Sequence, residues 1–87
     1  MTVITLDEIR NLPIDTYVYV DTRGRIAYEH GHIPDALCWS RGEDPDVLPR
    51  DKKLILYCSV GLNSVGDARD LKAAGCDACS LQNGYRA

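Results

Sequence analysis

The sequence predicts an α/β domain built on a mainly parallel sheet. Short runs of β-branched and aromatic residues alternate with segments of helical pattern, as in repeated βα units. The clearest runs, residues 17–20 and 53–57, are apolar or aromatic along most of their length, which is typical of strands buried on both faces. No linker or internal repeat divides the 87 residues, so we expect one domain over residues 1–87.

The first helix is marked by its capping residues. Thr5 and Glu8 have the spacing of a capping box, in which each side chain accepts a hydrogen bond from the backbone N–H of the other residue. The helix should be short and end before Pro13, because the residue before a proline avoids helical geometry.

A second helix should span residues 64–74, where apolar residues recur at every third position and Gly75 follows. We expect its apolar face to contain Val65, Ala68, Leu71 and Ala74. The acidic segment 41–51 should be a loop with one helical turn. The expected strands are residues 2–5, 17–20, 36–39, 53–57 and 78–81.

Composition excludes several classes of function. Ten Lys and Arg against thirteen Asp and Glu give a net charge of −3, whereas nucleic-acid-binding domains normally carry a basic surface. The longest fully apolar stretch, residues 54–58, is far shorter than the ~20 residues that span a bilayer. The N-terminal residues lack the basic and long apolar regions of a secretory signal. We therefore expect a cytoplasmic protein that binds neither nucleic acid nor membrane.

Four cysteines, at positions 38, 58, 76 and 79, should be reduced thiols in that setting. Cys76 and Cys79 have the C-x-x-C spacing of redox and zinc sites. A zinc site would need two further ligands, and a redox pair would precede a helix rather than follow one. We therefore interpret both as core residues, as we do Cys38, and expect no metal.

Cys58 is the candidate nucleophile. It follows the strongest strand, and the turn of residues 59–64 leads into the second helix. Ligands of open α/β sheets bind beyond the carboxyl ends of the strands. The free N–H groups at a helix start carry partial positive charge, which favours a thiolate there, the form that acts as a nucleophile. Spacing alone leaves an equal alternative, in which Cys58 is a small apolar residue ending a core strand.

Four motifs, in matching order and spacing, relate the sequence to a known family. Residues 21–23 are similar to a D-x-R strand end, and residues 28–36 to the signature Y-x-x-G-H-I-P-G-A. Residues 57–64 resemble Y-C-x-x-G-x-R-S, and residues 81–84 resemble L-x-G-G. The sequence thus resembles the rhodanese-like family over nearly its whole length. The resemblance implies a rhodanese-like fold, a five-stranded mainly parallel sheet flanked by helices.

The resemblance also implies sulfur transfer through a persulfide on Cys58. The thiolate would take the outer sulfur of thiosulfate or of a low-molecular-weight persulfide, and pass it to a thiol or to cyanide. No metal or organic cofactor is implied. The residues that would hold the transferred sulfur and the substrate are Ser59, Val60, Gly61, Leu62, Asn63 and Ser64.

Two positions depart from the family pattern. Asn63 stands where the family has Arg or another cation, so charge-assisted hydrogen bonds to an anionic donor are lost and thiosulfate should be a poor donor. Asn83 stands in place of a Gly, a milder change because Asn tolerates left-handed backbone. The sequence argues against a phosphatase of the cell-division-cycle type, because the loop of such a phosphatase is one residue longer and contains Arg.

The change at Asn63 leaves an alternative function, a catalytically silent rhodanese-like binding or regulatory module. A thiol redox module that uses Cys76 and Cys79 is a remote third hypothesis.

By the same resemblance, the other polar residues of the motifs have structural roles. His32 should bond to backbone in a turn, and His30 should lie at the surface. Asp21 and Arg23, at a strand end near the site where either could contact substrate, should form a structural ion pair or a turn hydrogen bond.

Family members usually continue beyond the equivalent of Ala87 with a Trp and a closing helix, so one interpretation is an excised module. The turn after Cys58 resembles that of rhodanese modules attached to flavin-dependent coenzyme A disulfide reductases. This suggests such a reductase domain as a covalently linked partner.

Overall fold

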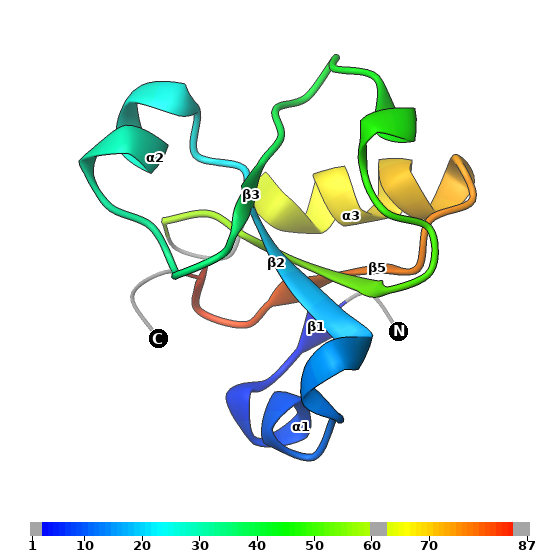
Figure 1. The fold of residues 1–87 in the computed structure, drawn as a ribbon. Coiled ribbons are helices and arrows are strands. Elements are labelled where there is room, and N and C mark those ends of the chain that lie inside the picture. The colour runs from blue at the N-terminus through cyan, green and yellow to red at the C-terminus, as the bar shows by residue number, and fades with distance from the viewer. Residues whose placement is uncertain (1–2, 60–62, 85–87) are drawn as a thin grey trace.

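All five strands of the sheet run parallel. The computed structural model describes residues 3–59 and 63–84. The strands lie in the order β1-β5-β4-β2-β3, and every neighbouring pair is parallel (Figure 1). The predicted five-stranded parallel sheet is therefore confirmed. The strands are β1 (Val3–Ile4), β2 (Tyr17–Asp21), β3 (Leu37–Cys38), β4 (Lys53–Tyr57) and β5 (Ala78–Leu81).

Helices connect the strands and cover the sheet. They are α1 (Leu6–Arg10), α2 (Arg25–His30) and α3 (Asn63–Ala73), with 3₁₀ turns at Ile14–Thr16 and Pro45–Val47. The second of these turns confirms the single helical turn expected in the acidic loop. Across the described ranges, no helix has the length and apolar character needed to cross a bilayer.

The two short helices differ in how well their sequences mark them. α1 begins at the predicted capping box, where the N–H of Glu8 donates to Oγ1 of Thr5 at 3.2 Å and the N–H of Thr5 donates to Oε1 of Glu8 at 3.0 Å. α2 is a helix that the residue patterns do not predict. Its N-cap residue, Gly24, offers no side-chain hydrogen bond and none of its residues is buried, so neither a cap nor an apolar stripe marks it.

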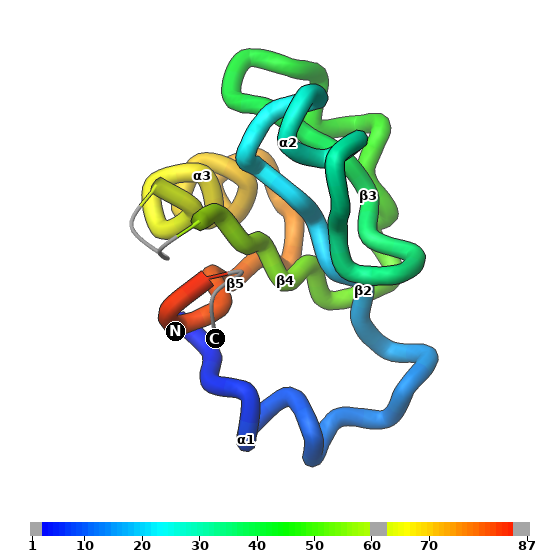
Figure 2. Tube along the Cα trace, turned by 90° about the vertical axis from the view of Figure 1, so that its left-hand side faces the viewer, coloured from blue at the N-terminus to red at the C-terminus, as the bar shows by residue number. Residues whose placement is uncertain are grey.

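Apolar clusters cover the sheet on both faces. Leu54 and Leu56 of β4 pack on one face with Leu71 of α3. Ile55, which alternates to the opposite face, belongs to a second cluster with Ile9 of α1. Figures 1 and 2 show α3 and α1 on different sides of the strands. β4 therefore runs through the centre of the core, and its carboxyl end is held in a fixed place.

The buried face of α3 differs from the predicted one. The buried residues are Ser64, Asp67, Ala68 and Leu71. Val65 is only half-buried, and Ala74, just beyond the end of the helix, is exposed. A spacing of three residues falls short of the 3.6 residues in a helical turn, so residues 65 and 74 cannot share a face. The real stripe includes two polar residues, and each of these has a partner.

One of these polar residues joins α3 to the sheet. Ser64 and Ser80 of β5 are both fully buried, and their Oγ atoms lie 2.5 Å apart. A buried hydroxyl left without a hydrogen bond costs about 1–3 kcal/mol. The pair therefore fixes the first turn of α3 against β5, close to the turn that follows β4.

We predict that Ser80→Ala lowers the free energy of unfolding by about 1–3 kcal/mol, because the Ser64 hydroxyl stays buried without its partner. The double variant Ser64→Ala/Ser80→Ala should lose less free energy of unfolding than the two single variants lose together, since it removes both polar groups. Urea unfolding of the native chain and the three variants measures these values. Strictly additive losses would contradict mutual pairing of the two hydroxyls.

Candidate active site at the carboxyl end of β4

Cys58 directly follows β4, at the edge of the sheet where β2 also ends. Asp21 and Tyr57, the last residues of the two strands, stand opposite each other in the register. The Cys58 side chain is buried, with 3% of the residue exposed. Its position is the edge at which parallel α/β sheets bind ligands.

The predicted substrate-binding turn is described only in part. Ser59 and Asn63 are exposed, and Asn63 is the first residue of α3. The Ser64 side chain points to Ser80, which leaves its backbone N–H as the group that a substrate could use. Val60, Gly61 and Leu62 lie outside the described residues.

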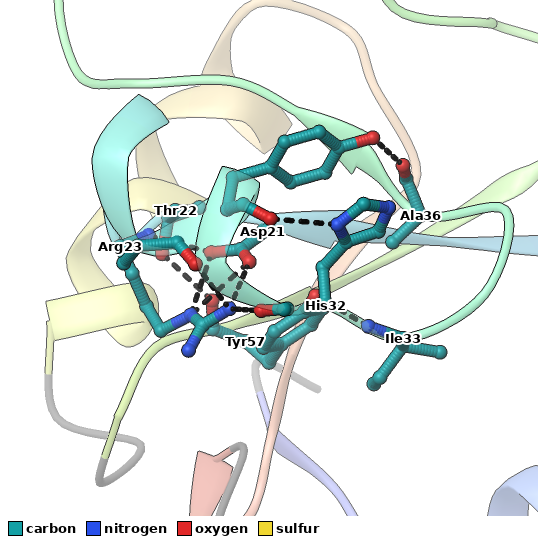
Figure 3. Close-up of polar contacts among 10 residues, drawn as sticks. Asp21, Thr22, Arg23, His32, Ile33, Ala36 and Tyr57 are labelled. Atoms are coloured by element: carbon teal, nitrogen blue, oxygen red, sulfur yellow. Dashed lines mark hydrogen bonds and ion pairs between the residues drawn. The ribbon is translucent and has the colours of Figure 1, made fainter.

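Hydrogen bonds from two directions fix the residue before Cys58. The backbone N–H and the hydroxyl of Thr22 both donate to the carbonyl oxygen of Tyr57, each at 3.0 Å. On the side-chain end, the hydroxyl oxygen of Tyr57 accepts the N–H of Ile33 at 3.1 Å. Figure 3 shows these contacts gathered around the end of β4. The backbone that carries Cys58 is therefore held firmly in place.

A buried ion pair supports the same edge. Nη2 of Arg23 lies 2.7 Å from Oδ2 of Asp21, and the Arg23 backbone N–H donates to Oδ1 of Asp21 at 2.8 Å. The side chains are 12% and 0% exposed, respectively. Nη2 also donates to the carbonyl oxygen of Gly31 at 2.5 Å, and the guanidinium lies 5.6 Å from the centre of the Tyr57 ring. The predicted structural ion pair is confirmed, and it ties the end of β2 to the turn after α2.

The two histidines stand as predicted. Nδ1 of His32 lies 2.7 Å from the carbonyl oxygen of Tyr28, so this nitrogen carries the proton and donates it. The ring also stacks on Tyr28, with ring centres 3.7 Å apart. His30 is exposed at the end of α2. Both contacts of His32 are with Tyr28, so its ring holds the turn after α2 against that helix.

The Tyr57 hydroxyl is unsuited to proton transfer at neutral pH. Burial is the main reason that the pKa of its hydroxyl is raised to about 12. The hydroxyl therefore stays protonated and serves as a structural partner for the backbone of Ile33.

A polar cavity of about 280 Å³ adjoins this edge and is lined by Thr22, Arg41, Asn63 and Asp67. Nε of Arg41 donates to Oδ1 of Asp67 at 2.9 Å. The Asp67 side chain is 5% exposed and that of Arg41 is 66% exposed. The hydrogen bond to Asp67 is the main cause that raises the pKa of the Arg41 guanidinium. Asn63 was expected here, whereas Arg41 and Asp67 were not singled out by any sequence motif.

Cys76 and Cys79 lie away from this arrangement, whereas Cys38 stands opposite Asp21 in the register of β2 and β3, and no cysteine is in a disulfide. Cys76 and Cys79 are buried, as predicted, but Cys38 is only half-buried at the sheet edge and so is not the core residue expected. Burial is the main cause that raises the pKa of the Cys38 and Cys79 thiols. Among residues 3–59 and 63–84, no group of three or more His, Cys, Asp or Glu side chains could hold a metal ion.

A larger cavity, of about 410 Å³, lies at the opposite edge of the sheet. Lys53, the first residue of β4, and Asp77, just before β5, line it. It is therefore separated from Cys58 by the length of β4.

Comparisons with known proteins agree with this arrangement. The rhodanese-like domain family matches residues 5–87. The tRNA sulfurtransferase of Desulfurococcus amylolyticus is 38% identical over 84 residues, which cover 93% of this chain and 17% of that protein. The chain thus spans about a sixth of the length of this curated relative.

Solved structures share the fold. A rhodanese-like domain protein of Staphylococcus aureus superposes with a TM-score of 0.82 at 29% identity, covering 100% of this chain and 90% of that one. The reduced CoADR-RHD protein of Bacillus anthracis has a TM-score of 0.79 at 20% identity, covering 99% of this chain and 16% of that one. The family model matches residues 5–87, and the sheet order and the motifs gathered at the end of β4 agree with that match. The chain therefore belongs to the rhodanese-like domain family.

Proposed function

We propose that this domain is a sulfurtransferase or persulfide carrier that moves sulfane sulfur through a persulfide on Cys58. The observation that carries the proposal is the placement of a buried thiol directly after β4, at an edge held by the motifs of the rhodanese-like family. The sulfurtransferase relative at 38% identity supports sulfur transfer at the level of the family.

In the first step, the Cys58 thiolate attacks the outer sulfur of a donor. With a persulfide donor R–S–SH, the S–S bond of the donor breaks, a new S–S bond forms between the Cys58 thiolate and the outer sulfur, and the proton of the donor leaves with R–SH. With thiosulfate, the thiolate displaces sulfite and keeps the outer sulfur. In both cases Cys58 ends as the persulfide anion.

In the second step, an acceptor thiolate or cyanide attacks the terminal sulfur of this persulfide. The S–S bond on Cys58 breaks, the sulfur leaves with the acceptor, and the Cys58 thiolate is restored. No net oxidation or reduction of the protein occurs over the two steps. The cycle therefore needs a sulfur donor and a sulfur acceptor, and no metal or organic cofactor.

The turn after Cys58 would stabilise the charge on the terminal sulfur. We propose this role for the backbone N–H groups of residues 59–64, with Ser64 acting through its N–H because its hydroxyl faces Ser80. Preoriented donors aimed at developing charge contribute about 3 kcal/mol each in comparable sites. The fixed Tyr57 carbonyl would hold the start of this turn in position.

Larger relatives suggest that the domain works beside other domains. The tRNA sulfurtransferase and the CoADR-RHD protein are both several times longer than this chain. We propose a linked disulfide reductase domain as one such partner. The net charge of −3 gives no reason to assign tRNA binding to this domain itself.

Asn63 favours a second candidate function, a catalytically silent binding or regulatory module. Its side chain is neutral and exposed at the start of α3, so it gives an anionic donor no charge to bind. The two candidates differ in one measurable property, which is whether Cys58 accepts sulfur.

We predict that incubation with a low-molecular-weight persulfide adds one sulfur atom to the native chain, as measured by intact mass. Cys58→Ser should abolish the gain because it removes the nucleophile. Cys38→Ser is the matched control, since Cys38 is more exposed than Cys58 yet has no proposed role. If the native chain gains no sulfur, the silent module is favoured. If Cys38→Ser loses the gain, Cys58 is not the sole nucleophile and the proposal for Cys58 is contradicted.

We also predict that Asn63→Arg raises kcat/KM for thiosulfate by about tenfold, since a charge-assisted hydrogen bond gains roughly 1.4 kcal/mol over a neutral one. Asn63→Gln, which lengthens the side chain without charge, is the control and should leave the value near that of the native chain. Release of sulfite, or thiocyanate formation from cyanide, measures the rate. An unchanged or lower rate in Asn63→Arg would refute the role given to charge at this position.

A further inference from the structure

One cation lines the cavity beside the candidate active site without belonging to any of the family motifs. Arg41 lies in the connection between β3 and β4, which passes over α3 (Figure 1). It meets α3 through the hydrogen bond from Nε to Oδ1 of Asp67, at 2.9 Å. The cavity of about 280 Å³ that it lines with Thr22 and Asn63 is open to solvent on the Arg41 side, where the side chain is 66% exposed.

The guanidinium of Arg41 keeps donors for a ligand. Arginine has five N–H donors, and among the described residues Arg41 gives only Nε–H to a protein acceptor. Asp67 is 5% exposed, so packing holds its carboxylate and the carboxylate in turn orients the guanidinium. Nη2 lies close to Gly66, where an added Cβ would be 3.6 Å away. The remaining Nη donors form the forked pair that matches a carboxylate.

The cavity adjoins the place where sulfur transfer is proposed. Thr22 lines it and also donates twice to the carbonyl oxygen of Tyr57, the residue before Cys58. Arg23 lies near the same edge, but its guanidinium binds Asp21 and the carbonyl oxygen of Gly31. Within the described residues, Arg41 is therefore the cation that lines this cavity.

We propose that Arg41 determines substrate specificity by selecting low-molecular-weight persulfides that carry a carboxylate. This inference rests on the proposed sulfur transfer at Cys58. The carboxylate binds the Nη groups of Arg41, while the outer sulfur of the same molecule is presented to Cys58. Transfer is balanced as before: the S–S bond of R–S–SH breaks, the new S–S bond forms on the Cys58 thiolate, and R–SH leaves with the proton and its carboxylate. Asp67 acts as a positioning residue, because it touches Arg41 and not the substrate.

The test compares two donors that differ in one group, the persulfide of mercaptoacetate and the persulfide of its neutral amide. The readout is the ratio of the initial rates at which Cys58 gains sulfur, measured by intact mass. The native chain should prefer the carboxylate donor, and Arg41→Gln should lower the ratio by about tenfold, as expected for loss of one charge-assisted hydrogen bond. Gln keeps an N–H donor for Asp67, so the buried carboxylate is not left unpaired.

Arg50→Gln is the matched control for this ratio. Arg50 lies in the same connection, and its Nη2 is 2.7 Å from Oδ1 of Asp46. Its Nη1 donates to the carbonyl oxygen of Ala74 at 2.8 Å, just beyond the carboxyl end of α3. The ratio should stay at the native value in Arg50→Gln. An unchanged ratio in Arg41→Gln, or an equal fall in Arg50→Gln, would overturn the proposal.

A binding measurement separates this proposal from the proposed function. In the Cys58→Ser chain, which cannot accept sulfur, the carboxylate (methylthio)acetate, CH3–S–CH2–COO⁻, should shift the NMR signals of the Asn63 side-chain amide and of Arg41 Nε–H. Its neutral amide should not, and Cys58→Ser/Arg41→Gln should lose the response at Asn63. If the carboxylate probe does not bind, the role proposed for Arg41 is refuted. Failure of both persulfide donors to load the native chain would instead refute sulfur transfer at Cys58, with the anion site still judged by the NMR result.

Discussion

The hydrogen bonds to the carbonyl of Tyr57, and the buried ion pair beside it, are the constraint on which the arrangement at Cys58 depends. A fully buried carboxylate such as that of Asp21 is costly unless it is paired and fully hydrogen-bonded. Arg23 meets this requirement with its side chain and its own backbone N–H. The same guanidinium bonds to Gly31, so the end of β2 and the turn after α2 are held together. Thr22, between the two charged residues, is thereby placed over the end of β4.

Two arginines near this edge form similar ion pairs but have different capacities. Arg23 is 12% exposed, and its guanidinium bonds to protein carbonyls as well as to Asp21. Arg41 is 66% exposed, and its partner Asp67 is bound through Nε alone. The first arginine is part of the framework, whereas the second presents donors to solvent at the cavity. The exposure of the cation, more than the presence of the ion pair, separates the structural role of Arg23 from the binding role proposed for Arg41.

The sequence predicts the strands, the first helix cap and the Asp21–Arg23 pair well, because each depends on a local pattern, whereas the hydrogen bond from Thr22 to Tyr57 joins residues 35 positions apart and was not predicted. The capping box at Thr5, the apolar strands and the D-x-R motif each leave a mark within a few neighbouring residues. Asn83 has a φ of 66°, in the left-handed region that Asn tolerates. α2 was missed because it has neither a side-chain cap nor a buried residue.

The Arg41–Asp67 contact was missed for a different reason. It joins residues 26 positions apart, and no local pattern records such a pairing. A signal was present in the helix: with 3.6 residues per turn, Asp67 lies on the face of Ser64 and Leu71, and a carboxylate on a core-facing stripe requires a partner. The predicted face, with its spacing of three, placed Asp67 off the stripe and removed that signal. An error in the period of one helix thus concealed part of the candidate site.

The burial of Cys58 constrains which substrates the proposed chemistry can use. With 3% of the residue exposed, the resting thiol offers little surface to a donor, so the proposed chemistry favours a narrow group such as a terminal sulfur over a bulky electrophile. Adding one sulfur lengthens the side chain by about 2 Å, the length of an S–S bond, so the loaded form presents its reactive atom farther from the backbone than the resting thiol does. In the proposed cycle, the acceptor therefore meets a more extended sulfur than the donor does, and a second point of attachment would hold the sulfur of the donor at the thiol. Under the proposal for Arg41, the cation at the adjoining cavity supplies that point, so its effect should be larger on loading Cys58 than on unloading it.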